Sequence, residues 1–188
     1  MPWGLIFVAN NGKISIKDIS IKKGKAMKRI FRDLLCALLI AALISALVGC
    51  EDYEAENFTV LDSSLNEVEL YDLIGKPIVL NFWATWCYYC KIEMPHFEAA
   101  AEKYTDVVFM MVNYTDGENE TVESAAAYIE EEGYTFPIYY DTSLQAADAY
   151  AVQAFPTTVF IDRDGRVVKT YEGSLSADRL EYYVDMIK

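Results

Sequence analysis

The chain has 188 residues, of which 53% are hydrophobic and 14% aromatic, so it can bury a sizeable core and is not globally disordered. Its formal net charge is −13, yet the first 50 residues carry eight of the 16 basic side chains and only two of the 29 acidic ones. The remainder is strongly acidic, which argues against nucleic acid as a partner and means that attachment to an anionic membrane needs a dedicated anchor. The length fits one domain with an appendage.

Residues 27–49 have the three parts of a secretory signal: a basic start, an apolar run from Leu34 to Val48, and a small residue before Cys50. The run is shorter than the roughly 20 residues that span a bilayer, which favours cleavage. The ending "LVGC" resembles the bacterial lipobox, which implies a lipid on Cys50 that holds the protein on the extracytoplasmic face of the bacterial cell membrane. The alternative is a buried helix or an uncleaved span, with Cys50 an ordinary thiol.

The segments on either side of this signal are not expected to fold. Residues 1–26 show neither a core pattern nor a second targeting motif, so we expect translation to start at Met27; a genuine basic extension is the alternative. Residues 50–56 would be the lipidated cysteine and an acidic tether. The folded domain is therefore predicted over 57–188, in a compartment where disulfides persist.

The folded domain is predicted to be α/β, with helices flanking a mixed central sheet. The first two strands are expected to form an N-terminal hairpin, and the last two are joined by Asp164 and Gly165, a strong hairpin signal. The predicted strands are 58–61, 68–70, 78–83, 107–113, a short one within 136–141, 157–161 and 167–171. Four helices are predicted: one starts at Tyr88, one covers 121–132, one covers 144–150 and one follows Ser176 at the C-terminus.

Apolar periodicity supports these elements. The continuous run Ile78–Trp83 is typical of a strand buried on both faces. Three of these helices show an apolar stripe. We expect Gly133 to end the helix at 121–132 and Ser176 to cap the C-terminal helix. The residues of the stripes are Ile92, Phe97, Ala100 and Ala101; Val122, Ala125, Ala126 and Ile129; and Leu180, Tyr183, Val184 and Ile187.

Cysteine counting leaves three interpretations of the pair in "NFWATWCYYCKIEMP". If Cys36 is lost with the signal and Cys50 carries lipid, only Cys87 and Cys90 remain in the folded domain. A zinc site would need two more ligands, and the chain has a single histidine, His96, so no metal is expected. A purely structural disulfide would close a very short loop and stabilise little. The third interpretation is a pair that opens and closes.

The position of the pair favours this third interpretation. Cys87 follows a predicted strand and stands at or next to the N-terminus of a predicted helix. Unpaired backbone N–H groups and the helix dipole stabilise a thiolate there, which makes the sulfur a nucleophile at neutral pH. Cys90 lies one turn further on the same face and can attack a mixed disulfide formed at Cys87.

The segment "FWATWCYYCKIEMP" resembles the active-site segment of the thioredoxin superfamily, and in particular of its ResA/TlpA-like thiol-disulfide oxidoreductases. The resemblance continues to the C-terminus over about 130 residues. It implies a thioredoxin-like fold, with the helix at 121–132 as an extra helix inserted after the second core strand.

The resemblance also implies roles for residues outside the cysteine pair. It places Pro156, as a cis-proline, and Phe155 opposite the pair, where with Trp86 they would bind an extended substrate segment. An ordinary trans-proline at a strand edge is the alternative for Pro156. Glu93 would relay protons to and from the thiols, since Asn81 stands where cytoplasmic thioredoxins have a buried aspartate; a solvated surface glutamate is the alternative.

The expected function is a membrane-tethered thiol-disulfide oxidoreductase. Cys87 would attack disulfides of exported proteins, Cys90 would resolve the mixed disulfide, and a membrane thiol reductant would restore the dithiol. We expect a monomer with no cofactor besides the redox-active pair. Two alternatives stay open: a thiol peroxidase on the same fold, although Ala84 and its neighbours supply no peroxiredoxin-type loop, and a non-catalytic lipoprotein binding module.

Overall fold

The computed structural model describes residues 31–32, 34–35 and 54–188. The chain divides into two units, Met1–Glu51 and Asp52–Lys188. The predictions for the start at Met27 and for Cys50 lie outside the described residues, as does the predicted signal apart from four helical residues. Within the described ranges, none of the helices combines the length and the apolar character needed to cross a bilayer.

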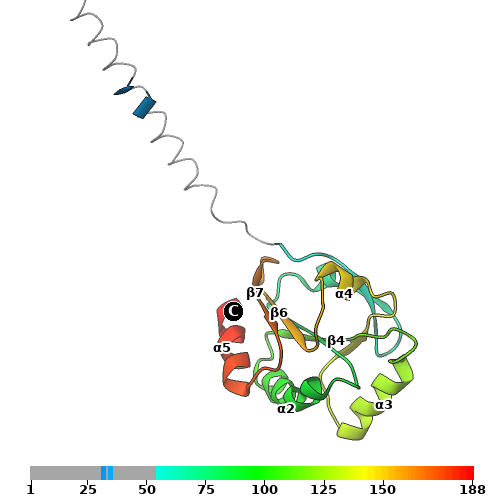
Figure 1. The fold of residues 1–188 in the computed structure, drawn as a ribbon. Helices are drawn as coiled ribbons and strands as arrows, with labels where there is room; N and C mark the ends of the chain where they lie inside the picture. The colour runs from blue at the N-terminus through cyan, green and yellow to red at the C-terminus, as the bar shows by residue number, and fades with distance from the viewer. Residues whose placement is uncertain (1–30, 33, 36–53) are drawn as a thin grey trace, which may run out of the picture. The chain divides into compact units, whose positions relative to one another are not determined.

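The second unit is built on a seven-stranded mixed sheet. Its strands are β1 (Thr59–Asp62), β2 (Glu67–Glu69), β3 (Ile78–Trp83), β4 (Val108–Asn113), β5 (Ile138–Tyr140), β6 (Thr157–Ile161) and β7 (Val167–Glu172). They lie in the order β2-β1-β5-β4-β3-β6-β7, with the N-terminal hairpin at one edge and the C-terminal hairpin at the other (Figure 1). At the centre, β3 pairs parallel with β4 and antiparallel with β6, so the predicted mixed sheet is confirmed.

Five helical segments flank the sheet: η1 (Leu70–Leu73), α2 (Tyr88–Lys103), α3 (Val122–Glu132), α4 (Gln145–Ala149) and α5 (Ala177–Ile187). The core on one face joins side chains of α2, α3 and α5, whereas the core on the other face takes in Leu70 of η1 and Ala146 of α4. Figure 1 shows α2 and α3 on the opposite side of the sheet from α4. As predicted, α3 stands between β4 and β5, and it ends at Gly133 in the left-handed conformation with φ of 74°.

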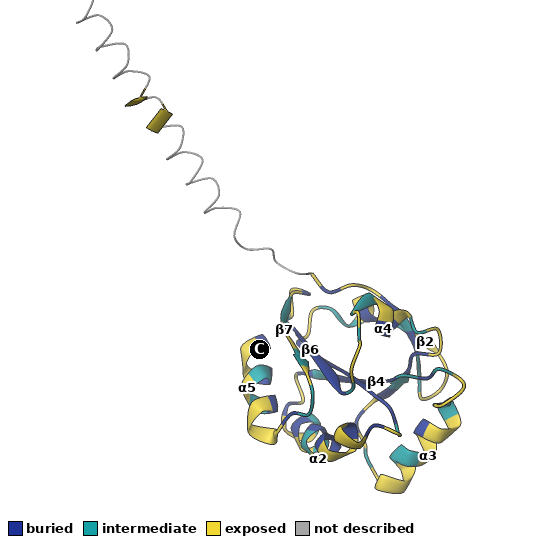
Figure 2. Ribbon diagram, viewed as in Figure 1, coloured by how far each residue is buried: buried dark blue, intermediate teal, exposed yellow. Residues whose placement is uncertain are grey.

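All six residues of β3 are buried, because the strand lies between the two cores. Its neighbours β4 and β6 are largely in the dark blue of buried residues in Figure 2. Since successive side chains of a strand point to opposite faces, Ile78, Leu80 and Phe82 enter the core beneath α4. Val79 and Trp83 enter the core beneath α2. Asn81 points to the same face of the sheet as these two residues, so its polar amide lies under α2.

Three details of the helices differ from the prediction, two in the apolar stripes and one at a helix cap. In α2, Ile92 is exposed, while Glu93 and Met94 are buried, because the inner face of this helix runs through Cys90 and Phe97. In α3, Ala126 is exposed and Ala125 is the buried residue. In α5, Ser176 is the N-cap residue, but its side chain makes no capping hydrogen bond.

The start of the domain also differs from the prediction, which placed residues 50–56 in a tether. Glu54 forms a β-bridge with Arg166, and the buried Ala55 donates its N–H to the Gly165 carbonyl at 2.8 Å. The Tyr71 hydroxyl donates to the Ala55 carbonyl at 3.1 Å. Residues 54–56 therefore belong to the folded unit, because the β6–β7 turn pairs with Glu54 and Ala55 and the Tyr150 hydroxyl donates to the Glu56 carbonyl at 3.1 Å.

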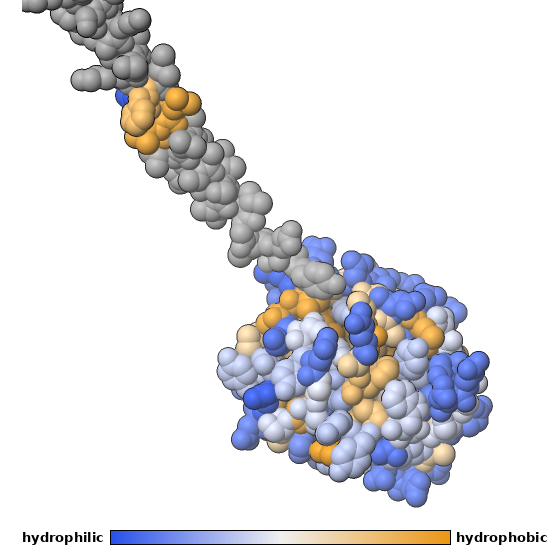
Figure 3. Space-filling model, viewed as in Figure 1, coloured by the Kyte–Doolittle hydropathy of each residue, from blue (hydrophilic) through white to orange (hydrophobic). Residues whose placement is uncertain are grey.

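The surface of this unit reflects its acidic composition. Hydrophilic colours cover much of the face of the domain that is visible in Figure 3. Ion pairs between side chains at the surface include Lys103–Glu181 and Lys188–Asp106. Such exposed pairs contribute little to stability, so the two apolar cores hold the fold together.

Candidate active site

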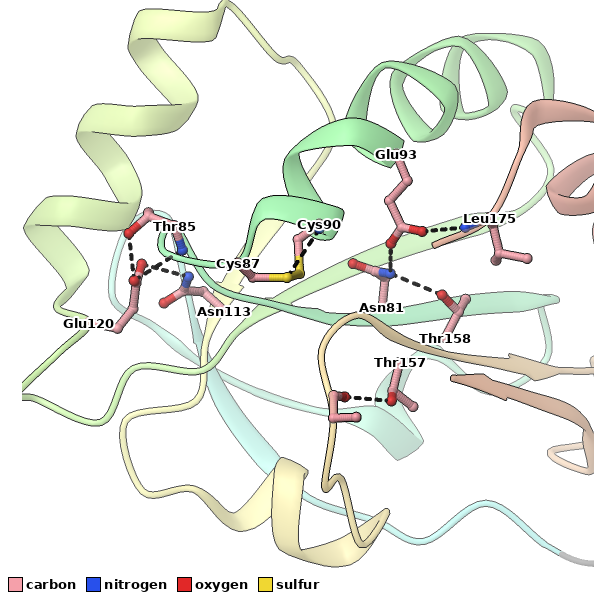
Figure 4. Close-up of a disulfide and its surroundings, with 11 residues drawn as sticks. Asn81, Thr85, Cys87, Cys90, Glu93, Asn113, Glu120, Thr157, Thr158 and Leu175 are labelled. Atoms are coloured by element: carbon pink, nitrogen blue, oxygen red, sulfur yellow. Dashed lines mark hydrogen bonds between the residues drawn. A yellow bond between two sulfur atoms is a disulfide. The ribbon is translucent and has the colours of Figure 1, made fainter. Parts of the chain in front are cut away.

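Cys87 and Cys90 form a disulfide at the junction between β3 and α2 (Figure 4). Cys87 is the N-cap residue of α2, and Tyr88 begins the helix. The Cys87 sulfur accepts a hydrogen bond from the Cys90 N–H at 3.1 Å. The predicted strand-to-helix junction is therefore confirmed, and a free backbone donor of the helix end points at the first sulfur.

The two cysteines differ slightly in their exposure to solvent. Cys87 is 6% exposed, whereas Cys90 is fully buried. A disulfide partner from outside can therefore approach Cys87 first. The hydrogen bond at Cys87 would also stabilise a thiolate there, because a charged acceptor at a helix N-terminus gains from both the donor and the dipole.

Exposed aromatic residues flank the first cysteine in the sequence. Trp86, Tyr88 and Tyr89 are all more than half exposed. The Trp86 ring packs edge-on against Phe155, with ring centroids 5.5 Å apart, and the Phe155–Pro156 peptide bond is cis, as the resemblance implied. The structure therefore brings Phe155 into contact with Trp86, the residue before Cys87, although the two rings come from loops about 70 residues apart in the sequence.

Glu93 lies one turn after Cys90 and is fully buried, so the alternative of a solvated surface glutamate is wrong. Its Oε1 accepts a hydrogen bond from the Asn81 side-chain amide at 2.9 Å, and its Oε2 accepts one from the Leu175 N–H at 2.7 Å. The same Asn81 amide donates to the Thr158 hydroxyl at 3.0 Å. Figure 4 shows this network, which joins α2, β3, β6 and the turn after β7.

Burial changes the proton affinity of Glu93. Loss of water around the carboxylate raises its pKa to about 7, although the hydrogen bonds from Leu175 and Asn81 act in the opposite direction. A carboxyl group with a pKa of about 7 exchanges protons readily near neutral pH, which is the property that general acid–base chemistry requires. The site thus holds a disulfide at the start of α2 and, one turn further along this helix, a buried carboxyl group with a raised pKa.

A second buried carboxylate, Glu120, was not predicted. Its Oε2 accepts hydrogen bonds from the Thr85 N–H at 3.0 Å and from the Thr85 hydroxyl at 2.6 Å, and its Oε1 accepts one from the Asn113 amide at 3.0 Å. Thr85 precedes Cys87 by two residues, on the opposite side of the disulfide from Glu93 (Figure 4). Glu120 therefore fixes the backbone of the turn that carries the first cysteine.

Local sequence gives little signal for Glu120, which stands in the polar stretch "TDGENET". The loop folds around Asp116, whose Oδ1 accepts the N–H groups of Glu118, Asn119 and Glu120. This turn directs one of three nearby acidic side chains inward. The only hint in the sequence is Thr85, two residues before Cys87, whose two donors need an acceptor.

Comparison with known proteins agrees with this geometry. Residues 52–170 match the model of the AhpC/TSA family. The chain belongs to this family. Among its relatives, thiol-disulfide oxidoreductase ResA of Oceanobacillus iheyensis is 32% identical over 180 residues, covering 88% of this chain and 92% of that protein. Thiol-disulfide oxidoreductase ResA of Bacillus subtilis is 33% identical, covering 82% of this chain and 88% of that protein.

Solved structures with the same fold include two redox proteins. The exposed lipoprotein thioredoxin of Streptococcus pneumoniae is 27% identical, with a TM-score of 0.62 over 70% of this chain and 99% of that chain. DsbF of MTB, solved in mixed oxidised and reduced forms, is 27% identical with a TM-score of 0.63, covering 70% of this chain and 95% of that chain. The predicted thioredoxin-like fold and ResA-like family are confirmed.

The chain is accordingly a thiol-disulfide oxidoreductase of this family, and its chemistry centres on the Cys87–Cys90 pair. Across the described residues, cysteine, histidine and acidic side chains nowhere gather in groups of three that could hold a metal ion. The arrangement combines a slightly exposed cysteine at a helix end, a fully buried second cysteine and a buried carboxyl group. An attacking and a resolving cysteine are the components that two-step thiol–disulfide exchange requires.

Proposed function

We propose that this protein reduces disulfides of exported proteins on the extracytoplasmic face of the cell membrane, as a lipid-anchored monomer. The observation that carries the proposal is the helix-end position of Cys87, whose sulfur accepts the Cys90 N–H, beside a fully buried Cys90. A thiolate stabilised in this way attacks, and a buried thiol one turn away resolves. The electron pair resides in the two sulfurs, so the reaction needs no further cofactor.

The proposed cycle is balanced in electrons and protons. The Cys87 thiolate attacks one sulfur of the substrate disulfide, forms a mixed disulfide and releases the first substrate thiol, which takes up a proton. Cys90 then loses its proton and attacks the Cys87 sulfur, releasing the second substrate thiol and forming the protein disulfide. A membrane dithiol reductant returns two electrons and two protons to the pair.

Glu93 is the proposed acceptor of the Cys90 proton. It follows Cys90 by one turn of α2, it is buried, and its pKa of about 7 lets it exchange protons at neutral pH. The loop of Phe155 and Pro156, packed against Trp86, is the proposed binding site for the extended substrate segment that carries the disulfide. The exposed aromatic rings near Cys87 would contact apolar side chains of that segment.

A redox titration of the full chain tests the proposed direction of electron flow. We expect a two-electron transition of Cys87 and Cys90 at a potential well below about −200 mV, because the reduction potential of a reductant must lie below the potentials of the disulfides that it reduces. The reduced chain should also reduce insulin disulfides and consume little hydrogen peroxide. A potential near about −120 mV would mark an oxidant, rapid peroxide consumption would mark a peroxidase, and the absence of a two-electron transition would contradict the proposal.

The anchor is proposed at Cys50, after removal of the signal at residues 27–49. The sequence motif supports it, and one solved relative is itself named an exposed lipoprotein. In a bacterial host, radiolabelled palmitate should enter the wild-type chain, and the chain should sediment with membranes. The Cys50→Ala variant should take up no label, because the thiol that receives the lipid is gone. Equal labelling of both chains would contradict lipidation at Cys50.

A further inference from the structure

His96 makes a contact for which the proposed cycle has no role. It stands three residues after Glu93 on α2 and is half-buried. Its Nδ1 lies 2.9 Å from the backbone carbonyl oxygen of Leu175. Because a carbonyl oxygen can only accept, the hydrogen must reside on Nδ1, both in the neutral ring and in the protonated one.

Leu175 is thereby held at both of its backbone polar groups by the same helix. Its N–H donates to Glu93 Oε2 at 2.7 Å, and its carbonyl accepts from His96 Nδ1. Residues three apart on a helix share a face, so Glu93 and His96 reach the same short segment together. The Leu175 side chain is fully buried, which leaves the segment little freedom to move away from α2.

We propose that His96 is a positioning residue for Glu93, because its hold on the Leu175 carbonyl keeps the Leu175 N–H directed at the Glu93 carboxylate. The inference rests on the proposed function in that Glu93 is taken as the proton acceptor. The physical consequence concerns the charged form of Glu93. A donor aimed at a buried carboxylate stabilises its ionised state, so the Leu175 N–H lowers the pKa of Glu93 against the effect of burial.

The elements around Glu93 carry few other groups whose charge could change its pKa. The strands β3, β4 and β6 carry no ionisable side chain, and neither does the turn 173–176. On α5, Arg179 contacts the Tyr171 hydroxyl and Glu181 pairs with Lys103. On α2 itself the nearby groups are Cys90, which does not titrate in the disulfide, and His96.

The test follows the Leu175 amide of the oxidised, ¹⁵N-labelled full chain by NMR in detergent while the pH is varied. The amide proton bonded to a carboxylate shifts when that carboxylate ionises, so it reports the Glu93 midpoint directly. Glu93→Gln should abolish this shift. His96→Phe keeps a ring and removes the donor, and we expect it to raise the midpoint by about 0.5 to 1 pH unit, roughly a three- to tenfold gain in proton affinity. His96→Asn places an amide N–H near the position of Nδ1 and should restore the wild-type midpoint.

The outcomes separate a positioning role from a merely structural one. If His96 only added stability, His96→Phe would lower the melting temperature and leave the Glu93 midpoint unchanged, which would overturn the inference. An equal shift in His96→Phe and His96→Asn would also overturn it, because the donor would then be irrelevant. The oxidised protein performs no turnover in this measurement. Failure of the wild type to reduce insulin would therefore reject the proposed function alone and leave the NMR result as it stands.

Discussion

Replacing Cys87 by serine should abolish reduction of protein disulfides, with a loss of about three orders of magnitude or more, because a hydroxyl at this position is not a nucleophile at neutral pH. Cys90 cannot take over, since its side chain is fully buried. The measurement is the initial rate of insulin reduction by the pre-reduced full chain. The serine keeps an oxygen that can accept the Cys90 N–H, so the helix end should remain formed.

Cys90→Ser is the matched control, because it keeps the accessible thiol and removes the resolving one. It should accumulate a mixed disulfide with the substrate at Cys87, visible by mass spectrometry under non-reducing conditions, while Cys87→Ser should not. The reverse result, a trapped adduct in Cys87→Ser only, would make Cys90 the attacking thiol and would contradict the assignment from exposure. Turnover by Cys87→Ser close to the wild-type rate would reject the dithiol cycle altogether.

Raising the pH from about 4.5 to about 7.5 should destabilise the oxidised wild type relative to Glu93→Gln by up to about 3 kcal/mol. Burial raises the pKa of Glu93 to about 7 from the ordinary value of 4.5, so between these values the folded chain keeps a proton that the unfolded chain has lost. Stability therefore falls as the pH rises through this window and becomes level above the folded pKa.

Urea unfolding of both oxidised variants at several pH values measures this difference. The comparison with Glu93→Gln cancels other groups that titrate in both chains, such as Asp141, whose pKa is raised by burial. Glutamine offers one acceptor oxygen to the two donors from Asn81 and Leu175, so this variant should be less stable than wild type at pH 4.5. A difference that does not vary with pH, or one that favours wild type at high pH, would contradict the raised pKa.

Much of the domain could be predicted because its elements carry local patterns. The run Ile78–Trp83 has the bounds of β3, and Thr157–Ile161 has the bounds of β6. The cysteine pair follows a buried strand and opens a helix in both the prediction and the structure. The less accurate details concern which helix face is buried, as at Ile92. When small and polar residues are interspersed in a short apolar stripe, more than one face of the helix fits the pattern.

The partners of the buried polar groups could not be predicted in this way. Leu175 is 82 residues from Glu93 and 79 from His96, and Glu120 is 35 residues from Thr85. No period or motif links such positions, since each contact depends on how the turn after β7 or the loop before α3 packs against α2. The composition of the segments "KIEMPH" and "TDGENET" is typical of polar surface, although each segment contributes a buried carboxylate.

The sequence by itself determined the sheet strands, the position of the cysteine pair at the start of a helix, and the choice of Cys87 and Cys90 as the reacting residues, because these depend on neighbours within a few positions. Only the tertiary structure decided that Glu93 is buried with a pKa of about 7, that Leu175 is held between Glu93 and His96, and that Glu120 secures the turn before Cys87. The physical reason is that burial and hydrogen bonding of a carboxyl group are set by segments distant in the chain, and these meet only when the two cores form around the sheet.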